Sequence, residues 1–99
     1  MRRKYWTRRD VNHAEIRDGL RKLGAVVFDT ADLGGRALDL AVCWRGRVVF
    51  AEVKNSEVRW EVSEKQRESI EALHAVGVEA IVAISIEDVV EAFGTLKTA

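Results

Sequence analysis

The sequence predicts one α/β domain (α+β by stricter usage), in which helices flank a mixed β-sheet. Residues 78–84 form a nearly continuous apolar run, which is typical of a strand covered on both faces. A helical pattern directly precedes this run, so a mixed sheet flanked by helices is expected. Farther upstream, two strand-like segments flank the dipeptide Arg45-Gly46, which predicts a tight hairpin connection.

The first element is expected to be a helix. Asn12 is a plausible N-cap, because asparagine side chains accept hydrogen bonds from the first turn. Ile16, Leu20 and Leu23 follow at helical spacing. Gly24 stands where a glycine commonly ends a helix.

Three strands should come next, at residues 25–29, 37–44 and 47–53. Residues 30–36, which include Gly34 and Gly35, read as the loop before the second strand. In the last two strands, side-chain alternation predicts a common core face. It comprises Leu38, Leu40, Val42, Val49, Ala51 and Val53.

The second half of the chain predicts a helix, a strand and a helix. After a polar segment at residues 54–62, Ser63 and Gln66 have the spacing of a capping box, in which each residue satisfies a backbone N–H of the other. This helix should run to Gly77, and Ser85 should cap a last helix that ends near Phe93. The predicted order is therefore α, β, β, β, α, β, α.

The composition is that of a single soluble globular domain, with 99 residues of which 47% are hydrophobic and 32% charged. Such a short chain buries a modest core, so we expect a homodimer. There is no long apolar run and no signal-peptide pattern at the start, so a cytoplasmic protein is expected. The single cysteine, Cys43, excludes an internal disulfide and should be a small core residue.

Charge is distributed unevenly, although the formal net charge is zero. Residues 1–9 should form a basic arm, and residues 10–99 the domain. A basic arm with aromatic residues suits nucleic acid, because cations neutralise phosphates and rings stack on bases. Short basic termini also occur on proteins that bind no nucleic acid. The basic side chains of the arm are Arg2, Arg3, Lys4, Arg8 and Arg9.

Asp39, Glu52 and Lys54 are the candidate active-site residues. A two-residue turn at Arg45-Gly46 sets Asp39 directly opposite Glu52, and Lys54 shares the face of Glu52. Opposed carboxylates have Cβ atoms about 5 Å apart and repel each other, but a divalent cation between them removes this penalty. A cation beside such a metal can orient water and balance charge on a phosphate. The alternative is a surface hairpin with an ordinary salt bridge.

Two further residues are candidates for this site. Glu15 lies at the rim of the apolar stripe of the first helix, from which it could reach the metal, although it could equally be a solvated surface residue. Gln66 lies on the apolar side of its own helix, so its amide should turn toward the sheet. The capping box explains Gln66 without catalysis, and both interpretations stay open.

These residues resemble the PD-(D/E)XK nuclease superfamily. The resemblance runs from about residue 10 to residue 93, and within the superfamily the chain is similar to phage VRR-NUC domains and to archaeal-type Holliday junction resolvases. The motifs that carry it are the helix with Glu15, then Gly34-Gly35, Leu38-Asp39-Leu40, Ala51-Glu52-Val53-Lys54 and Ser63-Glu64-Lys65-Gln66.

The resemblance implies a restriction-endonuclease-like fold and a metal-dependent endonuclease. Glu15, Asp39 and Glu52 would bind Mg²⁺ or Mn²⁺, Lys54 would position the attacking water, and Gln66 would be an auxiliary active-site residue. The implied substrate is branched double-stranded DNA, foremost a Holliday junction that a homodimer nicks in pairs, in the host cytoplasm if a phage encodes the protein. Arg36 would join the basic arm in contacting phosphates.

Two other functions remain open on the sequence. One is a different nuclease of the superfamily, of the flap, repair or restriction type, and the other is a catalytically inactive DNA-binding module. The sequence also leaves the roles of three tryptophans open between core, dimer contact and base stacking. These are Trp6, Trp44 and Trp60.

Overall fold

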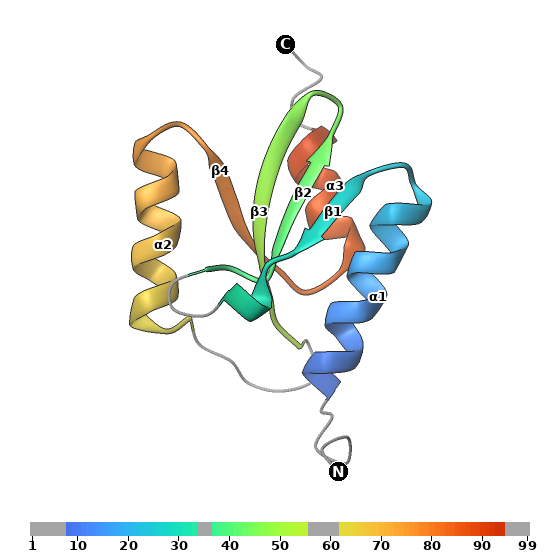
Figure 1. Cartoon of the computed structure of the whole chain (residues 1–99), viewed down its shortest axis with the longest axis horizontal. Helices are drawn as coiled ribbons and strands as arrows, with labels where there is room; N and C mark the ends of the chain where they lie inside the picture. The colour runs from blue at the N-terminus through green and yellow to red at the C-terminus, as the bar shows by residue number, and fades with distance from the viewer. Residues whose placement is uncertain (1–7, 34–36, 56–61, 95–99) are drawn as a thin grey trace.

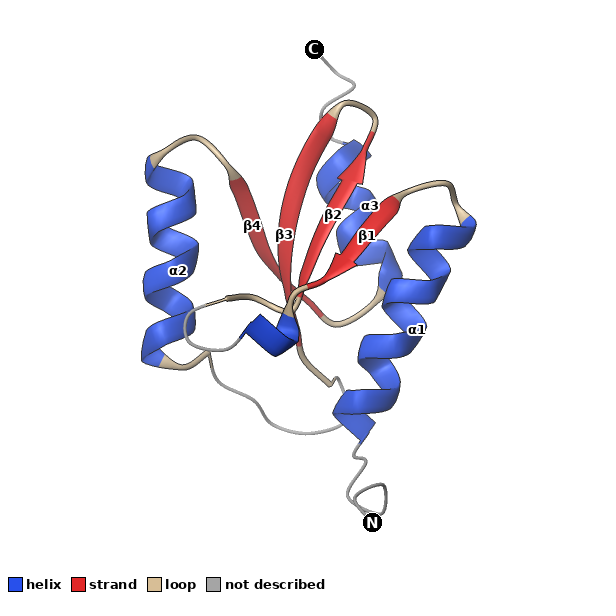
Figure 2. Cartoon of the chain, in the orientation of Figure 1, coloured by secondary structure: helices blue, strands red, loops and turns tan. Residues whose placement is uncertain are grey.

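The computed structural model describes residues 8–33, 37–55 and 62–94, with side chains from Asn12 onward. The observed order of helices and strands is the predicted one, with an added 3-10 turn. Figure 2 shows this turn between the first two strands. The elements are α1 (Arg8–Lys22), β1 (Val26–Asp29), η2 (Ala31–Leu33), β2 (Leu40–Trp44), β3 (Arg47–Val53), α2 (Glu64–Ala75), β4 (Glu79–Ala83) and α3 (Ile86–Gly94).

One mixed sheet is the middle of three layers, with helices on both sides, which confirms the predicted fold class. The strand order is β1-β2-β3-β4, with the first two pairings antiparallel and β3 parallel to β4. Figure 1 shows α2 on one side of this sheet and α1 and α3 on the other. The parallel pairing requires a crossover, which α2 provides.

The hairpin turn and the glycine at the end of the first helix lie where they were predicted. Arg45 and Gly46 have φ values of 54° and 77°, as a type I′ hairpin turn requires. Gly24 has a φ of 104°, and the N–H groups of Gly24 and Ala25 donate to the last carbonyls of α1, those of Arg21 and Leu20. This is the Schellman arrangement, and it directs the chain from α1 straight into β1.

The main core lies between the sheet and the layer of α1 and α3. Gly19 allows these two helices to approach closely, because a Cβ atom there would overlap the side chain of Ile86. On the same side, Trp44 meets Phe93 edge to face, with ring centroids 5.4 Å apart. Trp44 is thus a core contact. The buried cluster comprises Ile16, Leu20, Ala25, Val27, Leu40, Val42, Val49, Ala51, Val53, Ala83, Val89 and Phe93.

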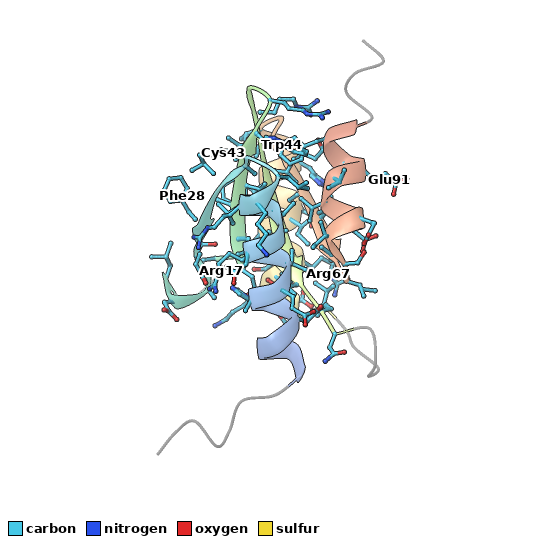
Figure 3. All side chains as sticks on the ribbon, turned by 90° about the vertical axis from the view of Figure 1, so that its right-hand side faces the viewer. Arg17, Phe28, Cys43, Trp44, Arg67 and Glu91 are labelled. Atoms are coloured by element: carbon cyan, nitrogen blue, oxygen red, sulfur yellow. The ribbon has the colours of Figure 1, made fainter. Side chains whose placement is uncertain are left out.

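Three expectations about the chain before β3 are wrong. α1 begins at Arg8 and not after Asn12, so Arg8 and Arg9 belong to the helix. No glycine or proline interrupts residues 8–12, and the Asn12 side chain bonds to carbonyls at the ends of β3 and β4 and does not cap the helix. Cys43 is only half-buried, because alternation places it opposite the core face, and Figure 3 shows it on the side away from α3.

Leu38 is the third. It is buried as predicted, but on the side of α2, where it lines an apolar cavity with Phe50 and Leu73 and is not part of the core cluster. Alternation predicts facing only within a strand, and β2 begins at Leu40. Among the described residues, no helix is long and apolar enough to span a membrane.

Candidate active site

Glu52 and Lys54 lie at the carboxyl end of β3, where the strand leaves the sheet. Their flanking residues Ala51 and Val53 are in the core cluster, so alternation turns Glu52 toward the layer of α2. Glu52 is 1% exposed and Lys54 8%. The Lys54 Nζ lies 3.8 Å from the Glu52 Oε2, which makes this a nearly buried ion pair.

Asp39 joins this pair from the neighbouring strand. The register between β2 and β3 is the predicted one. The pair farthest from the turn is Leu40 opposite Ala51, and Asp39 directly precedes Leu40 in the sequence. At Asp39 the contact with β3 is made by the side chain, because the Asp39 Oδ2 accepts a hydrogen bond of 2.9 Å from the Val53 N–H. Asp39 is 8% exposed. Two carboxylates and one ammonium group are therefore buried at one end of the sheet.

Gln66 connects this cluster to α2 and also caps the helix. Its Nε2 donates a hydrogen bond to the Glu52 Oε2, and its Oε1 lies 3.5 Å from the Lys54 Nζ. The same Oε1 accepts from the Ser63 N–H at 3.0 Å, and the Gln66 N–H donates to the Ser63 Oγ at 3.1 Å. The capping box is confirmed, and it coexists with the contact to Glu52.

The donor set fits a hard divalent cation. Asp39 and Glu52 offer carboxylate oxygens, and with Lys54 charged the three side chains sum to one negative charge. Mg²⁺ is commonly held by one or two carboxylates, with waters and substrate phosphate oxygens completing its octahedral shell. In the part of the chain that the structure describes, no three His, Cys, Asp or Glu side chains gather into a larger ligand group.

Glu15 is not brought into this cluster. It is exposed on α1, and the hydrogen bonds described between site residues join Glu52, Lys54 and Gln66 without extending to it. The helical rim position alone could not decide this, because the reach of a glutamate depends on how α1 packs against the sheet.

Sequence reasoning missed Asn12 as a residue next to the site. Its Nδ2 donates to the Lys54 carbonyl at 2.7 Å and to the Ile84 carbonyl at 3.0 Å. A signal was present in the sequence: Asn12 precedes Ile16 and Leu20 at intervals of four and shares their buried stripe. A polar residue on such a stripe needs hydrogen-bond partners.

A second polar cluster lies where α1 meets the end of β1. The Asp29 Oδ2 lies 3.0 Å from the His13 Nε2 and accepts a hydrogen bond of 3.1 Å from the Arg17 Nη1. Burial raises the pKa of the Asp29 carboxyl, but the hydrogen bond and charge of His13, helped by Arg17, outweigh it and leave that pKa below its usual value. This carboxylate anchors α1 to the sheet.

The predicted DNA-contacting residues are mostly outside the described parts of the chain. This holds for Arg2, Arg3, Lys4 and Arg36, and for Trp6 and Trp60. Arg8 and Arg9 begin α1, but their side chains are not described.

Comparison with known proteins identifies the fold. No protein-family model matches the chain, and no curated protein matches it. A solved structure described as "VRR_NUC domain" superposes with a TM-score of 0.67 at 22% identity, covering 89% of this chain and 96% of the other. Identity this low establishes similarity of fold and no more. The chain therefore has the four-stranded α+β fold of a VRR_NUC domain.

Proposed function

We propose that this protein is a metal-dependent, structure-selective DNA endonuclease that resolves Holliday junctions by paired nicks. The observation that carries the proposal is the burial of Asp39 and Glu52 beside Lys54 at one end of the sheet. Two carboxylates that converge in a buried position offer the hard oxygen ligands with which proteins hold a divalent cation. The VRR_NUC-like fold and the resemblance to PD-(D/E)XK nucleases support the same chemistry.

Asp39 and Glu52 would hold the metal, Mg²⁺ with Mn²⁺ as a substitute. Their oxygens are hard ligands, and both side chains are fixed, Asp39 by the Val53 N–H and Glu52 by Gln66. When bound, the ion supplies Lewis-acid polarisation of the phosphate and activation of water. Glu15 stays a candidate third ligand because it lies one helical turn from Asn12, which contacts the Lys54 carbonyl.

Lys54 and Gln66 would act on the water and on the carboxylates. Lys54 carries a positive charge next to Glu52 in a nearly dry environment, where it can orient the attacking water and balance charge on the phosphate. Gln66 donates to one oxygen of Glu52 and so restricts its rotation. Fixing that carboxylate in advance reduces the reorganisation needed at the moment of cleavage.

A four-way junction is the preferred substrate in this proposal. Such a junction has approximate two-fold symmetry, and a homodimer would present two identical active sites for paired nicks. The basic residues near the N-terminus, together with Arg36, would contact backbone phosphates, which position a protein without reading sequence. Sedimentation or light scattering should show a dimer, and a monomer at working concentration would contradict this part.

The decisive experiment is cleavage of labelled four-way junctions, flaps and linear duplexes with Mg²⁺, Mn²⁺ or EDTA. Wild type should make symmetric nicks in the junction with either metal and none with EDTA. Asp39→Asn and Glu52→Gln should each lose this cleavage. Cleavage mainly of flaps or duplex ends would favour a repair-type or restriction-type nuclease, and DNA binding with no metal-dependent cleavage would favour an inactive binding module.

Glu79→Gln is the matched control for these variants. Glu79 is a carboxylate in the same sheet and forms an ion pair with Arg47, with Nη2 and Oε1 2.8 Å apart. It opens β4 and pairs with Val49, so it lies at the other end of the strands from Val53 and Ala83. Its substitution should leave cleavage unchanged. An equal loss in Glu79→Gln would show that charge removal anywhere in the sheet disables the protein, which would remove the support for a local metal site.

A further inference from the structure

Asn12 bridges the ends of the two parallel strands directly behind the proposed site. The last pair between β3 and β4 is Val53 opposite Ala83. Beyond it, the carbonyls of Lys54 and Ile84 both accept hydrogen bonds from the Nδ2 of Asn12, at 2.7 and 3.0 Å. A side chain of α1 therefore joins the two strands at the point where their ladder stops.

The chemistry of this bridge is specific to a primary amide. One amide nitrogen carries two hydrogens and can donate to two carbonyls at once, whereas a carboxylate of the same shape has no hydrogen to donate. The N–H groups of the two bridged residues are also bonded. Lys54 donates to the Ala83 carbonyl at 2.9 Å, and Ile84 donates to the Asp88 Oδ2 at 2.8 Å.

We infer that Asn12 is a positioning residue for Lys54. The N–H of Lys54 is held by β4 and its carbonyl by α1, so the peptide groups on both sides of its Cα have a fixed orientation. This fixes the direction in which the side chain leaves the backbone. That side chain is long and otherwise flexible, and it must place its ammonium group beside Glu52. This inference rests on the proposed function only in assigning Lys54 to catalysis.

The test compares Asn12→Ala and Asn12→Asp with Arg21→Ala in the full chain. Arg21 is the matched control because it makes the same kind of bond away from the site, from its Nη2 to the Val27 carbonyl at 2.7 Å. With a labelled four-way junction and Mg²⁺, both Asn12 variants should lower kcat by about ten- to a hundredfold, the effect of a small misplacement of a catalytic group. KM should stay within about threefold, because substrate binding does not depend on Lys54 alone.

The second readout is independent of activity. Amide hydrogen exchange at Lys54 and Ile84 should accelerate by about tenfold or more in both Asn12 variants, while Val49, in the middle of β3, keeps its protection. Arg21→Ala should change neither readout. Asn12→Asp should be at least as damaging as Asn12→Ala, because a carboxylate would face two carbonyl oxygens.

Three outcomes would overturn the inference. One is a folded Asn12→Asp variant with wild-type kcat, another is a loss of kcat in Arg21→Ala equal to that of the Asn12 variants, and the third is unchanged exchange at Lys54 and Ile84. Failure of the wild type to cleave any DNA would instead refute the proposed function. The exchange measurement would then decide by itself whether Asn12 holds the Lys54 peptide in place.

Discussion

Replacing Gln66 with glutamate should abolish the proposed cleavage and keep the cap of α2. Replacing Ser63 with alanine should weaken that cap and leave cleavage intact. Gln66 uses its Oε1 to cap the helix and its Nε2 to hold Glu52. Glutamate keeps the capping oxygen, because a capping box accepts either residue at this position. It loses the donor and adds a carboxylate against Glu52.

The size of the effect follows from the contacts at the site. A hydrogen bond to a charged group contributes about 1.5–3 kcal/mol, which is about ten- to a hundredfold in kcat if it acts on the barrier. Repulsion between carboxylates about 4 Å apart adds up to about 4 kcal/mol at an effective dielectric constant near 20. Ser63→Ala removes only the cap bond to the Gln66 N–H, which costs about 1 kcal/mol of stability. For a domain of this size that lowers Tm by about 4–8 °C.

Junction cleavage and thermal unfolding should be measured on the same preparations. The reasoning predicts that Gln66→Glu loses most of its kcat, and that its Tm also falls because the repulsion between the two carboxylates acts in the folded state. Ser63→Ala should lose Tm and keep its kcat. Wild-type kcat in Gln66→Glu would show that the contact with Glu52 serves no catalytic purpose. A large loss of kcat in Ser63→Ala would show that the helix cap is the relevant feature.

The structure leads to four further predictions. Lys54→Met should lower kcat by about a hundredfold or more, because a charge-stabilising group is removed, while calorimetry should still detect Mn²⁺ binding. Mg²⁺ at a hundred times its Kd should stabilise the wild type by about 2.7 kcal/mol in urea unfolding, and EDTA should reverse this. The pKa of the Asp29 carboxyl is lowered in the folded state, so its contact with His13 stabilises the protein at pH values above its unfolded pKa of 3.8. This stabilisation is lost as pH falls through the folded pKa. Asp29→Asn should therefore flatten the fall of Tm at acid pH. Phe93→Ala should cost about 3–5 kcal/mol in urea unfolding, since it empties a buried site and removes the ring contact with Trp44; a cost below about 1 kcal/mol would contradict the packing described.

The sequence predicted the part of the site that depends on local geometry. A two-residue turn at Arg45-Gly46 determines which residues face each other across β2 and β3, so the register could be counted outward from it. The capping box depends only on the spacing of Ser63 and Gln66. Local rules therefore located the two buried acids, the lysine and the cap.

The parts that could not be predicted depend on how elements pack together. Asn12 has the residue type of an N-cap, and only the placement of α1 against the ends of β3 and β4 shows what it bonds. Leu38 follows strand alternation in the sequence, but the strand begins two residues later. Similarly, the exposure of Glu15 depends on the rotation of α1 about its axis, which helical spacing leaves undetermined by tens of degrees.

The hairpin of β2 and β3 has a consequence for the order of folding. Its turn is short, so its contacts close small loops, whereas the bond from Asn12 to Ile84 joins residues 72 positions apart. We expect the hairpin to be structured in the folding transition state and the α1–α3 layer to pack later, so Val49→Ala should have a high φ-value and Val89→Ala a low one. The reverse pattern would refute this. If it holds, Asp39 and Glu52 approach each other before the surrounding core has excluded water, and their charges are still hydrated during the slowest step.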